Sequence, residues 1–141
     1  MKTHYKIKAF LEKKDDIVFA ILFGSAAEGR ETFMSDLDIG IYTVGDLSLP
    51  EIGMLVSELE GLTRRRVDVV VLNELYKKSP SLAFNIVKNG KLLFCKDEDT
   101  YTAFKRDTFR FYLDAKYLIE QTDHAMLNRI REGRFGVPGN A

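Results

Sequence analysis

Residues 24–38 read GSAAEGRETFMSDLD, with a Gly24-Ser25 pair at the start and two aspartates at the end. The segment before it, residues 17–23, reads IVFAILF and is typical of a buried central strand. This strand leads directly into the Gly-Ser turn. Ser25 is a good helix N-cap followed by helix-forming residues, so we expect a short helix whose free N–H groups attract phosphate.

The segment 35–42 alternates polar and apolar residues, which is the periodicity of a strand with one face in the core. In a strand, Asp36 and Asp38 share a face at a spacing of roughly 6.5 Å, whereas in a helix they would diverge by about 200°. Only the strand lets both carboxylates reach one metal centre. A third aspartate, Asp68, is the only charge inside the β-branched run 67–72, where it is costly unless paired or metal-bound.

Three aspartates on neighbouring strands suit Mg²⁺, which takes oxygen ligands at about 2.0–2.1 Å and keeps waters and substrate phosphates in its shell. Two such ions roughly 3.5–4 Å apart stabilise both the attacking and the leaving oxygen of an in-line displacement at phosphorus. We therefore expect Asp36, Asp38 and Asp68 to be metal-binding and catalytic. The alternative is that Asp36 caps a turn and Asp38 lies on a solvated strand face.

The Gly24-Ser25 pair, the Asp36-x-Asp38 pair and the later strand residue Asp68 resemble the signature of the polymerase-β-like nucleotidyltransferase superfamily. The resemblance covers roughly residues 1–95. Because the chain is short, it is similar to the minimal nucleotidyltransferases, which include the antitoxin partners of HEPN-domain ribonuclease toxins. The resemblance implies an α+β fold, with a mixed β-sheet, flanking helices and a long C-terminal helix.

The resemblance also implies a role for each motif. In the family the Gly-Ser turn binds the triphosphate, two aspartates hold Mg²⁺, and the third helps to bind metal and orients or deprotonates the acceptor hydroxyl. It implies two Mg²⁺ ions and ATP as the substrate of this chain. Two further residues of the same stretch, Arg30 and Ser35, are candidate nucleotide-binding residues.

One part of the stretch departs from the family pattern. Family members commonly carry Ala-Arg-Gly-Glu where this chain has Ala27-Glu28-Gly29-Arg30, so the two charges have exchanged places. Arg30 either reaches a phosphate from one residue further on or is a solvated charge at a helix end. Glu28 would repel a triphosphate, so the exchange bears on nucleotide affinity.

Two classes of function follow. The first is a Mg²⁺-dependent nucleotidyltransferase that transfers AMP from ATP to a hydroxyl of a partner protein, which in the antitoxin relatives is a tyrosine of the cognate HEPN-type toxin. The second is a binding module that neutralises a toxin by complexation, with nucleotide absent or regulatory. A small-molecule nucleotidyltransferase is a further alternative, although such relatives usually carry a larger second domain.

Composition places the chain among ordinary soluble domains, with 45% hydrophobic and 30% charged residues in a chain of 141. We expect one nucleotidyltransferase domain over residues 1–132 and a flexible tail over 133–141. The formal net charge is zero, so no overall field favours stable nucleic-acid binding. No apolar stretch approaches the 20 or so residues of a membrane span and the start of the chain lacks the apolar region of a signal peptide, so we expect a cytoplasmic protein.

The remaining elements follow from periodicity and from helix stop signals. An Asn89-Gly90 pair resembles a C-terminal glycine stop, and Pro50 precedes a clear helical stripe. The run Arg64-Arg65-Arg66 before the strand of Asp68 is either a set of solvated helix-end charges or a contact to phosphates or nucleic acid. We expect helices over 3–14, 51–63, 81–88 and 98–132, and strands over 17–23, 35–42, 67–72 and 91–96.

The last predicted helix carries two apolar stripes on nearly opposite faces. Phe109, Leu113 and Tyr117 are spaced at i, i+4 and i+8, so they form an apolar stripe that suggests a partner protein or self-association. The alternative is that a loop or the tail from Arg134 covers them. The nearly opposite face should pack on the sheet domain, and it carries Tyr101, Phe104, Thr108, Phe111, Ala115, Leu118, Thr122 and Met126.

Overall fold

The structure is a computed structural model that describes residues 2–25, 27 and 36–131. All the long helices and strands predicted from the sequence are present, and one short helix, α3, was not predicted. In chain order the elements are α1 (Lys2–Glu12), β1 (Ile17–Phe23), β2 (Leu37–Thr43), α2 (Leu49–Thr63), β3 (Val67–Val71), α3 (Leu75–Lys78), α4 (Pro80–Asn89), β4 (Lys91–Cys95) and α5 (Glu98–Arg131).

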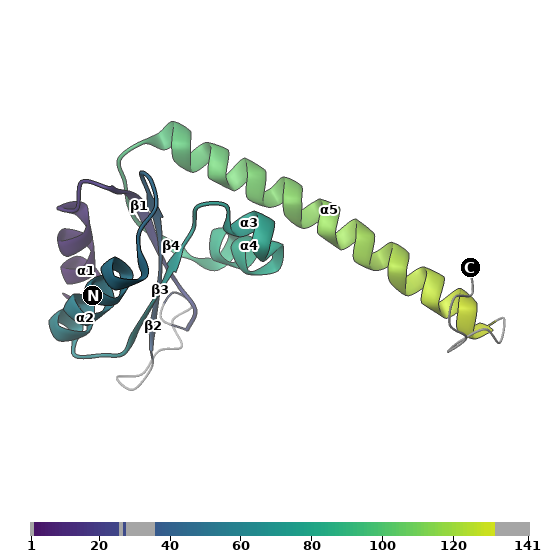
Figure 1. Cartoon of the computed structure of the whole chain (residues 1–141), viewed down its shortest axis with the longest axis horizontal. Helices are drawn as coiled ribbons and strands as arrows, with labels where there is room; N and C mark the ends of the chain where they lie inside the picture. The colour runs from purple at the N-terminus through teal and green to yellow at the C-terminus, as the bar shows by residue number, and fades with distance from the viewer. Residues whose placement is uncertain (1, 26, 28–35, 132–141) are drawn as a thin grey trace.

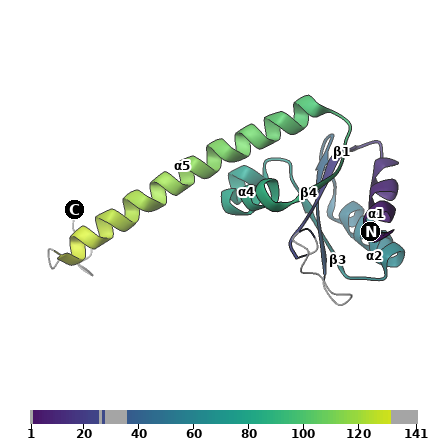
Figure 2. The ribbon, with the colours of Figure 1, turned by 180° about the vertical axis from the view of Figure 1, so that it is seen from behind.

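The four strands form a mixed sheet in the order β3-β2-β1-β4 (Figure 1). β1 runs antiparallel to both β2 and β4, whereas β2 and β3 are parallel because α2 crosses between them. Helices α1 and α2 lie on one side of the sheet, and α3, α4 and α5 lie on the other (Figures 1 and 2). The predicted α+β fold is therefore confirmed.

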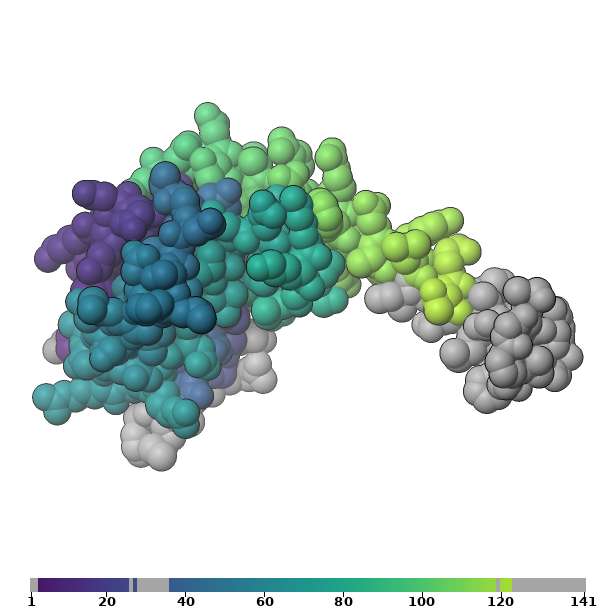
Figure 3. Space-filling view, viewed as in Figure 1, coloured from purple at the N-terminus to yellow at the C-terminus, as the bar shows by residue number. Residues whose placement is uncertain are grey.

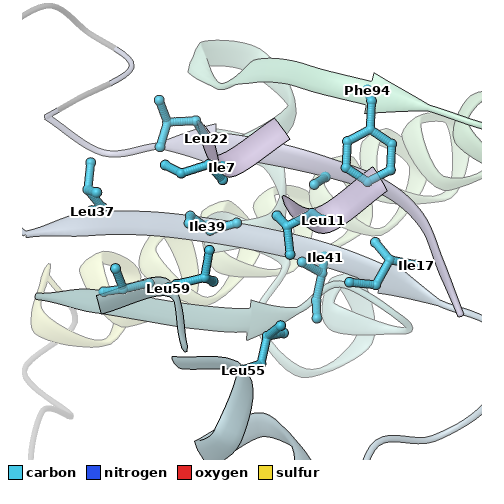
Figure 4. Close-up of a cluster of buried hydrophobic side chains, with 12 residues drawn as sticks. Ile7, Leu11, Ile17, Leu22, Leu37, Ile39, Ile41, Leu55, Leu59 and Phe94 are labelled. Carbon is cyan, nitrogen blue, oxygen red and sulfur yellow. The ribbon is translucent and has the colours of Figure 1, made fainter. Parts of the chain in front are cut away.

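A first hydrophobic cluster fills the space between the sheet and α1 and α2 (Figure 4). The alternation predicted for β2 is confirmed here, since Leu37, Ile39 and Ile41 are fully buried on this face. The helices contribute Leu11 from α1 and Leu59 from α2, which are also fully buried. Burial of such aliphatic side chains stabilises the fold by about 1.5–3 kcal/mol each.

A second hydrophobic cluster lies on the opposite face and is rich in aromatic rings. At its centre the ring of Phe19 stacks on Tyr42 with centroids 4.9 Å apart and contacts Phe104 of α5 at 5.6 Å. The first turns of α5 are anchored by these contacts. Each face of the sheet is therefore covered by one hydrophobic cluster. The strands cannot shift register without exposing one of the two clusters.

Helix α2 begins two residues before the predicted position because Ser48 caps it. The Ser48 hydroxyl accepts a hydrogen bond from the Glu51 N–H at 3.3 Å, and the Ser48 N–H donates to Glu51 Oε1 at 3.0 Å. This reciprocal pair is a capping box, and its Ser-x-x-Glu spacing is legible in the sequence. The helix ends at Thr63, and Arg64 follows in the left-handed conformation.

Helix α4 ends at Asn89, one residue beyond the predicted end at residue 88, and the role of Gly90 also differs from the prediction. Gly90 is extended, with φ −76° and ψ 162°, so it is not a left-handed helix stop. A Cβ at this position would overlap the carbonyl oxygen of Ile86 and would lie 2.5 Å from Cγ2 of Ile21. Glycine is required here because α4 turns into β4 directly against β1.

Among the described side chains of α5, the buried ones lie in the first half of the helix. Phe104 and Thr108 are buried, whereas Leu118 is 64% exposed and Thr122 is also exposed, so the predicted packing of these two residues is wrong. The physical reason is length, because a helix of 34 residues extends past the short helices that it packs on, and Figure 3 shows α5 projecting beyond the body. The side chain of Met126 lies outside the described residues. None of the described helices combines the length and the apolar character needed to cross a bilayer.

Candidate active site at one end of the sheet

The strand register brings the predicted motifs together at one end of the sheet. Asp38 of β2 lies opposite Asp68 of β3 on one side and opposite Phe23 of β1 on the other. Phe23 is the last residue of β1, so the Gly24-Ser25 turn follows at the same end. Asp36 precedes β2 by one residue and is exposed. The structure thus brings the three aspartates and the turn to the same end of three neighbouring strands.

Gly24 lies directly against the carboxylate of Asp38. Its φ of +78° belongs to the left-handed region that favours glycine. A Cβ at Gly24 would also overlap Oδ2 of Asp38. Both the backbone conformation and the close approach therefore require glycine, and they leave the backbone of the turn open beside the carboxylate.

A second glycine, Gly40, lies two residues after Asp38 on β2 and faces Leu72. A Cβ at Gly40 would lie 2.8 Å from Cδ2 of Leu72, which is fully buried. Leu72 therefore closes over β2 two residues beyond Asp38. Leu72 belongs to the second cluster, so this cluster reaches the polar end of the face.

Repulsion between carboxylates shapes the electrostatics of the site. Partial burial raises the pKa of Asp38 above its ordinary value, and the negative charges of Asp68 and Asp36 raise it further. A cation bound among the three would relieve this repulsion. The oxygen donors therefore fit a hard divalent ion such as Mg²⁺.

The three carboxylates do not by themselves form a complete coordination shell. No group of three or more histidine, cysteine, aspartate or glutamate side chains in the described part of the chain is arranged to hold a metal ion. Mg²⁺ usually keeps several waters and takes substrate phosphates as ligands rather than an all-protein cage. Asp36, Asp38 and Asp68 would hold such an ion with waters and phosphates completing its shell.

Three of the residues singled out in the sequence lie outside the described residues. They are Arg30, Ser35 and Glu28, and most of the short helix expected after Ser25 falls in the same segment. Ser25 itself is in a turn and is half-buried.

Arg66, the last residue of the arginine run, also lies at this end of the sheet. It lies two residues before Asp68, a spacing that places both side chains on one face of an extended segment. The structure gives Arg66 a position beside Asp36, because its carbonyl oxygen accepts a hydrogen bond from the N–H of Leu37 at 2.8 Å.

Comparison with known families agrees with this geometry. The family described as polymerase beta, nucleotidyltransferase, matches residues 5–99. This match covers more than half of the chain and includes the turn and all three aspartates, so the protein belongs to this nucleotidyltransferase family. Members of the family generally use Mg²⁺ and a nucleoside triphosphate.

Solved structures share the fold over almost the whole chain. A toxin–antitoxin structure with AMP-PNP is 22% identical, with a TM-score of 0.73, and the match covers 90% of this chain and 99% of that one. An MNT antitoxin in complex with a tri-AMPylated HEPN toxin of Shewanella oneidensis is 20% identical, with a TM-score of 0.69 and coverage of 89% and 97%. Among curated proteins, none matches the chain significantly. At these identities the structures establish a common fold.

Proposed function

We propose that this protein is a Mg²⁺-dependent nucleotidyltransferase that transfers AMP from ATP to a hydroxyl of a partner protein. The observation that carries the proposal is the contact of the Gly24 backbone with Asp38 and the pairing of Asp38 with Asp68 in the next strand. The proposal assigns phosphate binding to the turn, metal binding to two aspartates and the acceptor to the third, and all of these residues lie at one end of the sheet.

Each residue has a defined task in this reaction. Gly24 and Ser25 would hold the triphosphate, and Asp36 and Asp38, with help from Asp68, would hold the metal, which when bound would neutralise charge on the phosphates. The acceptor oxygen forms a bond to the α-phosphorus while the bond from that phosphorus to the α–β bridging oxygen breaks, and pyrophosphate leaves. The proton of the acceptor hydroxyl passes to the carboxylate of Asp68, which is exposed and therefore open to an incoming partner. Positioning and charge neutralisation supply most of the rate in phosphoryl chemistry.

We propose a HEPN-type ribonuclease toxin as the partner and a tyrosine as the acceptor, so that the protein acts as an antitoxin in the cytoplasm. Support comes from the solved structures that share the fold, which are toxin–antitoxin complexes and include one with a tri-AMPylated toxin. The stripe of Phe109, Leu113 and Tyr117 on α5 would dock this partner, since these side chains are 41%, 61% and 61% exposed.

The test is to incubate the protein with ATP, Mg²⁺ and the product of the neighbouring gene, and to measure added adenylyl groups by mass spectrometry. We expect modification by the wild type and none by the Asp36→Asn/Asp38→Asn variant. Asp46→Asn is the matched control, because Asp46 is exposed beyond the opposite end of β2 and should not affect transfer. Undiminished modification by the double variant would refute the proposal.

Calorimetry separates this proposal from neutralisation by complexation alone. The enzyme must bind ATP in the presence of Mg²⁺, and its inhibition of the partner must depend on ATP. A protein that inhibits the partner without binding nucleotide would instead be a binding module that has kept the motif.

A further inference from the structure

Among the described residues at the site, Arg66 is a cation whose position follows from the register of β2 and β3. Leu37 pairs with Val67, and Asp38 pairs with Asp68, in a parallel ladder that continues to the hydrogen bond between the Leu37 N–H and the Arg66 carbonyl. Arg66 therefore lies beside Asp36, one step further toward the end of the sheet than the pair of Asp38 and Asp68.

Alternation along β3 places Arg66 on the face that carries the aspartates. Val67 is 3% exposed and points into the first cluster, whereas Asp68 and Arg66 on either side of it are both exposed. Neighbouring strands lie about 4.8 Å apart, and residues two apart along a strand lie roughly 6.5 Å apart. Asp36, Asp38, Arg66 and Asp68 thus form a block of three acids and one base on one face.

The guanidinium of Arg66 is available to a ligand. Its side chain makes no ion pair or hydrogen bond with any residue that the structure describes, although two aspartates are its neighbours. Arginine stays charged at any physiological pH and presents five N–H donors in a planar fork, which suits a carboxylate or a phosphate. An oxyanion is therefore the ligand chemistry that this position favours.

The position of Arg66 relative to the Gly-Ser turn indicates which substrate carries that oxyanion. Gly24 follows β1, and β3 is separated from β1 by β2, so Arg66 lies about two strand spacings, roughly 9.6 Å, from the strand that leads into the turn. It lies instead beside Asp68, where the proposed reaction places the acceptor hydroxyl. Arg66 is thus on the acceptor side of the site.

We infer that Arg66 is an acceptor-binding residue that recognises an oxyanion next to the acceptor hydroxyl, an inference that rests on the proposed nucleotidyl transfer. Two sources have this chemistry: an acidic side chain of the partner near its acceptor residue, or the phosphate of an adenylyl group already attached to that residue. In the second case Arg66 would favour a second transfer over the first.

Steady-state kinetics of Arg66→Gln with the full-length partner protein test the inference. We expect the KM for the form of the acceptor that carries the oxyanion to rise about tenfold, equivalent to 1.4 kcal/mol, while the KM for ATP stays unchanged. Arg66→Lys should recover part of the loss, since it keeps the charge but not the fork. Arg64→Gln is the matched control, because Arg64 is an exposed arginine of the same run, and it should leave both constants unchanged.

Two acceptor forms distinguish the sources. If an acidic side chain is the ligand, Arg66→Gln slows the first transfer to unmodified partner, and replacing that acid by its amide slows the wild type equally. If the attached phosphate is the ligand, Arg66→Gln slows transfer only to purified mono-adenylylated partner. Equal rates for Arg66→Gln and the wild type on both forms would overturn the inference while leaving the proposed function intact. A wild type that transfers nothing would overturn both.

Discussion

The two faces of the sheet are built from the same strands and differ in what they carry. On the face toward α1 and α2, residues such as Leu37 and Ile39 enter a continuous apolar cluster. On the other face, the intervening residue Asp38 belongs to a group of carboxylates, and the aromatic cluster lies directly beside it, since Phe23 opposite Asp38 is one of its members. Successive side chains of a strand point to opposite faces of the sheet, so neighbouring positions can serve stability and chemistry separately. Substitutions on the two faces should therefore have different consequences.

The largest expected effect lies on the carboxylate face. Asp38→Asn should reduce AMP transfer by about 10³-fold, equivalent to roughly 4 kcal/mol, because it removes a charged metal ligand. Initial rates of adenylyl transfer to the partner protein check this, with circular dichroism to confirm that the variant is folded. Retention of more than a tenth of the wild-type rate would show that Asp38 is not a metal ligand.

The opposite face should respond in stability alone. Leu59 is fully buried in the first cluster, so Leu59→Ala should lower the free energy of unfolding by about 3 kcal/mol through lost burial and the cavity it leaves. Urea denaturation measures this, and the affinity for ATP should be unchanged where the variant is folded. Leu49→Ala on the same helix is the control, since Leu49 is 83% exposed and should cost almost nothing. A comparable loss in both variants would contradict the assignment of the core.

The site was more predictable from the sequence than the distant end of the fold. The positions of Asp36, Asp38 and Asp68 followed from local alternation, and local alternation is preserved when strands pair in register. The reach of α5 was not predictable, because an apolar stripe continues along the helix whether or not another element lies beneath it. Leu118 keeps the periodicity of Phe104 and Thr108 but extends past α4, and no local signal marks that boundary.

The packed and the exposed residues of α5 also differ, and the exposed stripe of Phe109, Leu113 and Tyr117 offers a prediction about binding. Leu113→Ser/Tyr117→Ser should weaken binding to the partner by about 2 kcal/mol or more, because the variant removes a tyrosine, a residue type enriched in binding hot spots, and the apolar area of Leu113. The stability of the isolated protein should hardly change, since both side chains are 61% exposed. Leu118→Ser is the matched control on a different side of the helix. Calorimetric titration with the partner measures all three affinities, and equal losses for both variants would show that the stripe is not specific.

The packed half of α5 contains a polar atom that the fold does not use. The Thr108 side chain is fully buried, and its Oγ1 has no hydrogen-bond partner among the described residues. A buried unsatisfied hydroxyl costs about 1 kcal/mol or more, so Thr108→Val should raise the free energy of unfolding by about 1 kcal/mol. Thermal or urea unfolding tests this. A lower stability for the variant would indicate that the hydroxyl finds a partner in solution.

The smallest expected effect is on stability but comes from the carboxylate face. The charged side chain of Asp38 should lower the free energy of unfolding. Asp38 and Asp68 are like charges opposite one another in adjacent strands, an arrangement that is destabilising, and other cross-strand pairs are worth roughly 0.2–1 kcal/mol. Since the pKa of Asp38 is raised in the folded protein, the native state binds its proton more tightly than the unfolded chain does. The resulting stability is present below the ordinary aspartate pKa of 3.8 and is lost as pH rises through the folded pKa.

In metal-free buffer Asp38→Asn should therefore be more stable than the wild type at neutral pH, and this advantage should shrink in acid. Urea unfolding of both proteins across this pH range measures the difference, and Asp46→Asn should show none. A variant that is less stable at neutral pH would mean that the carboxylate is satisfied by the fold rather than held in place for the chemistry.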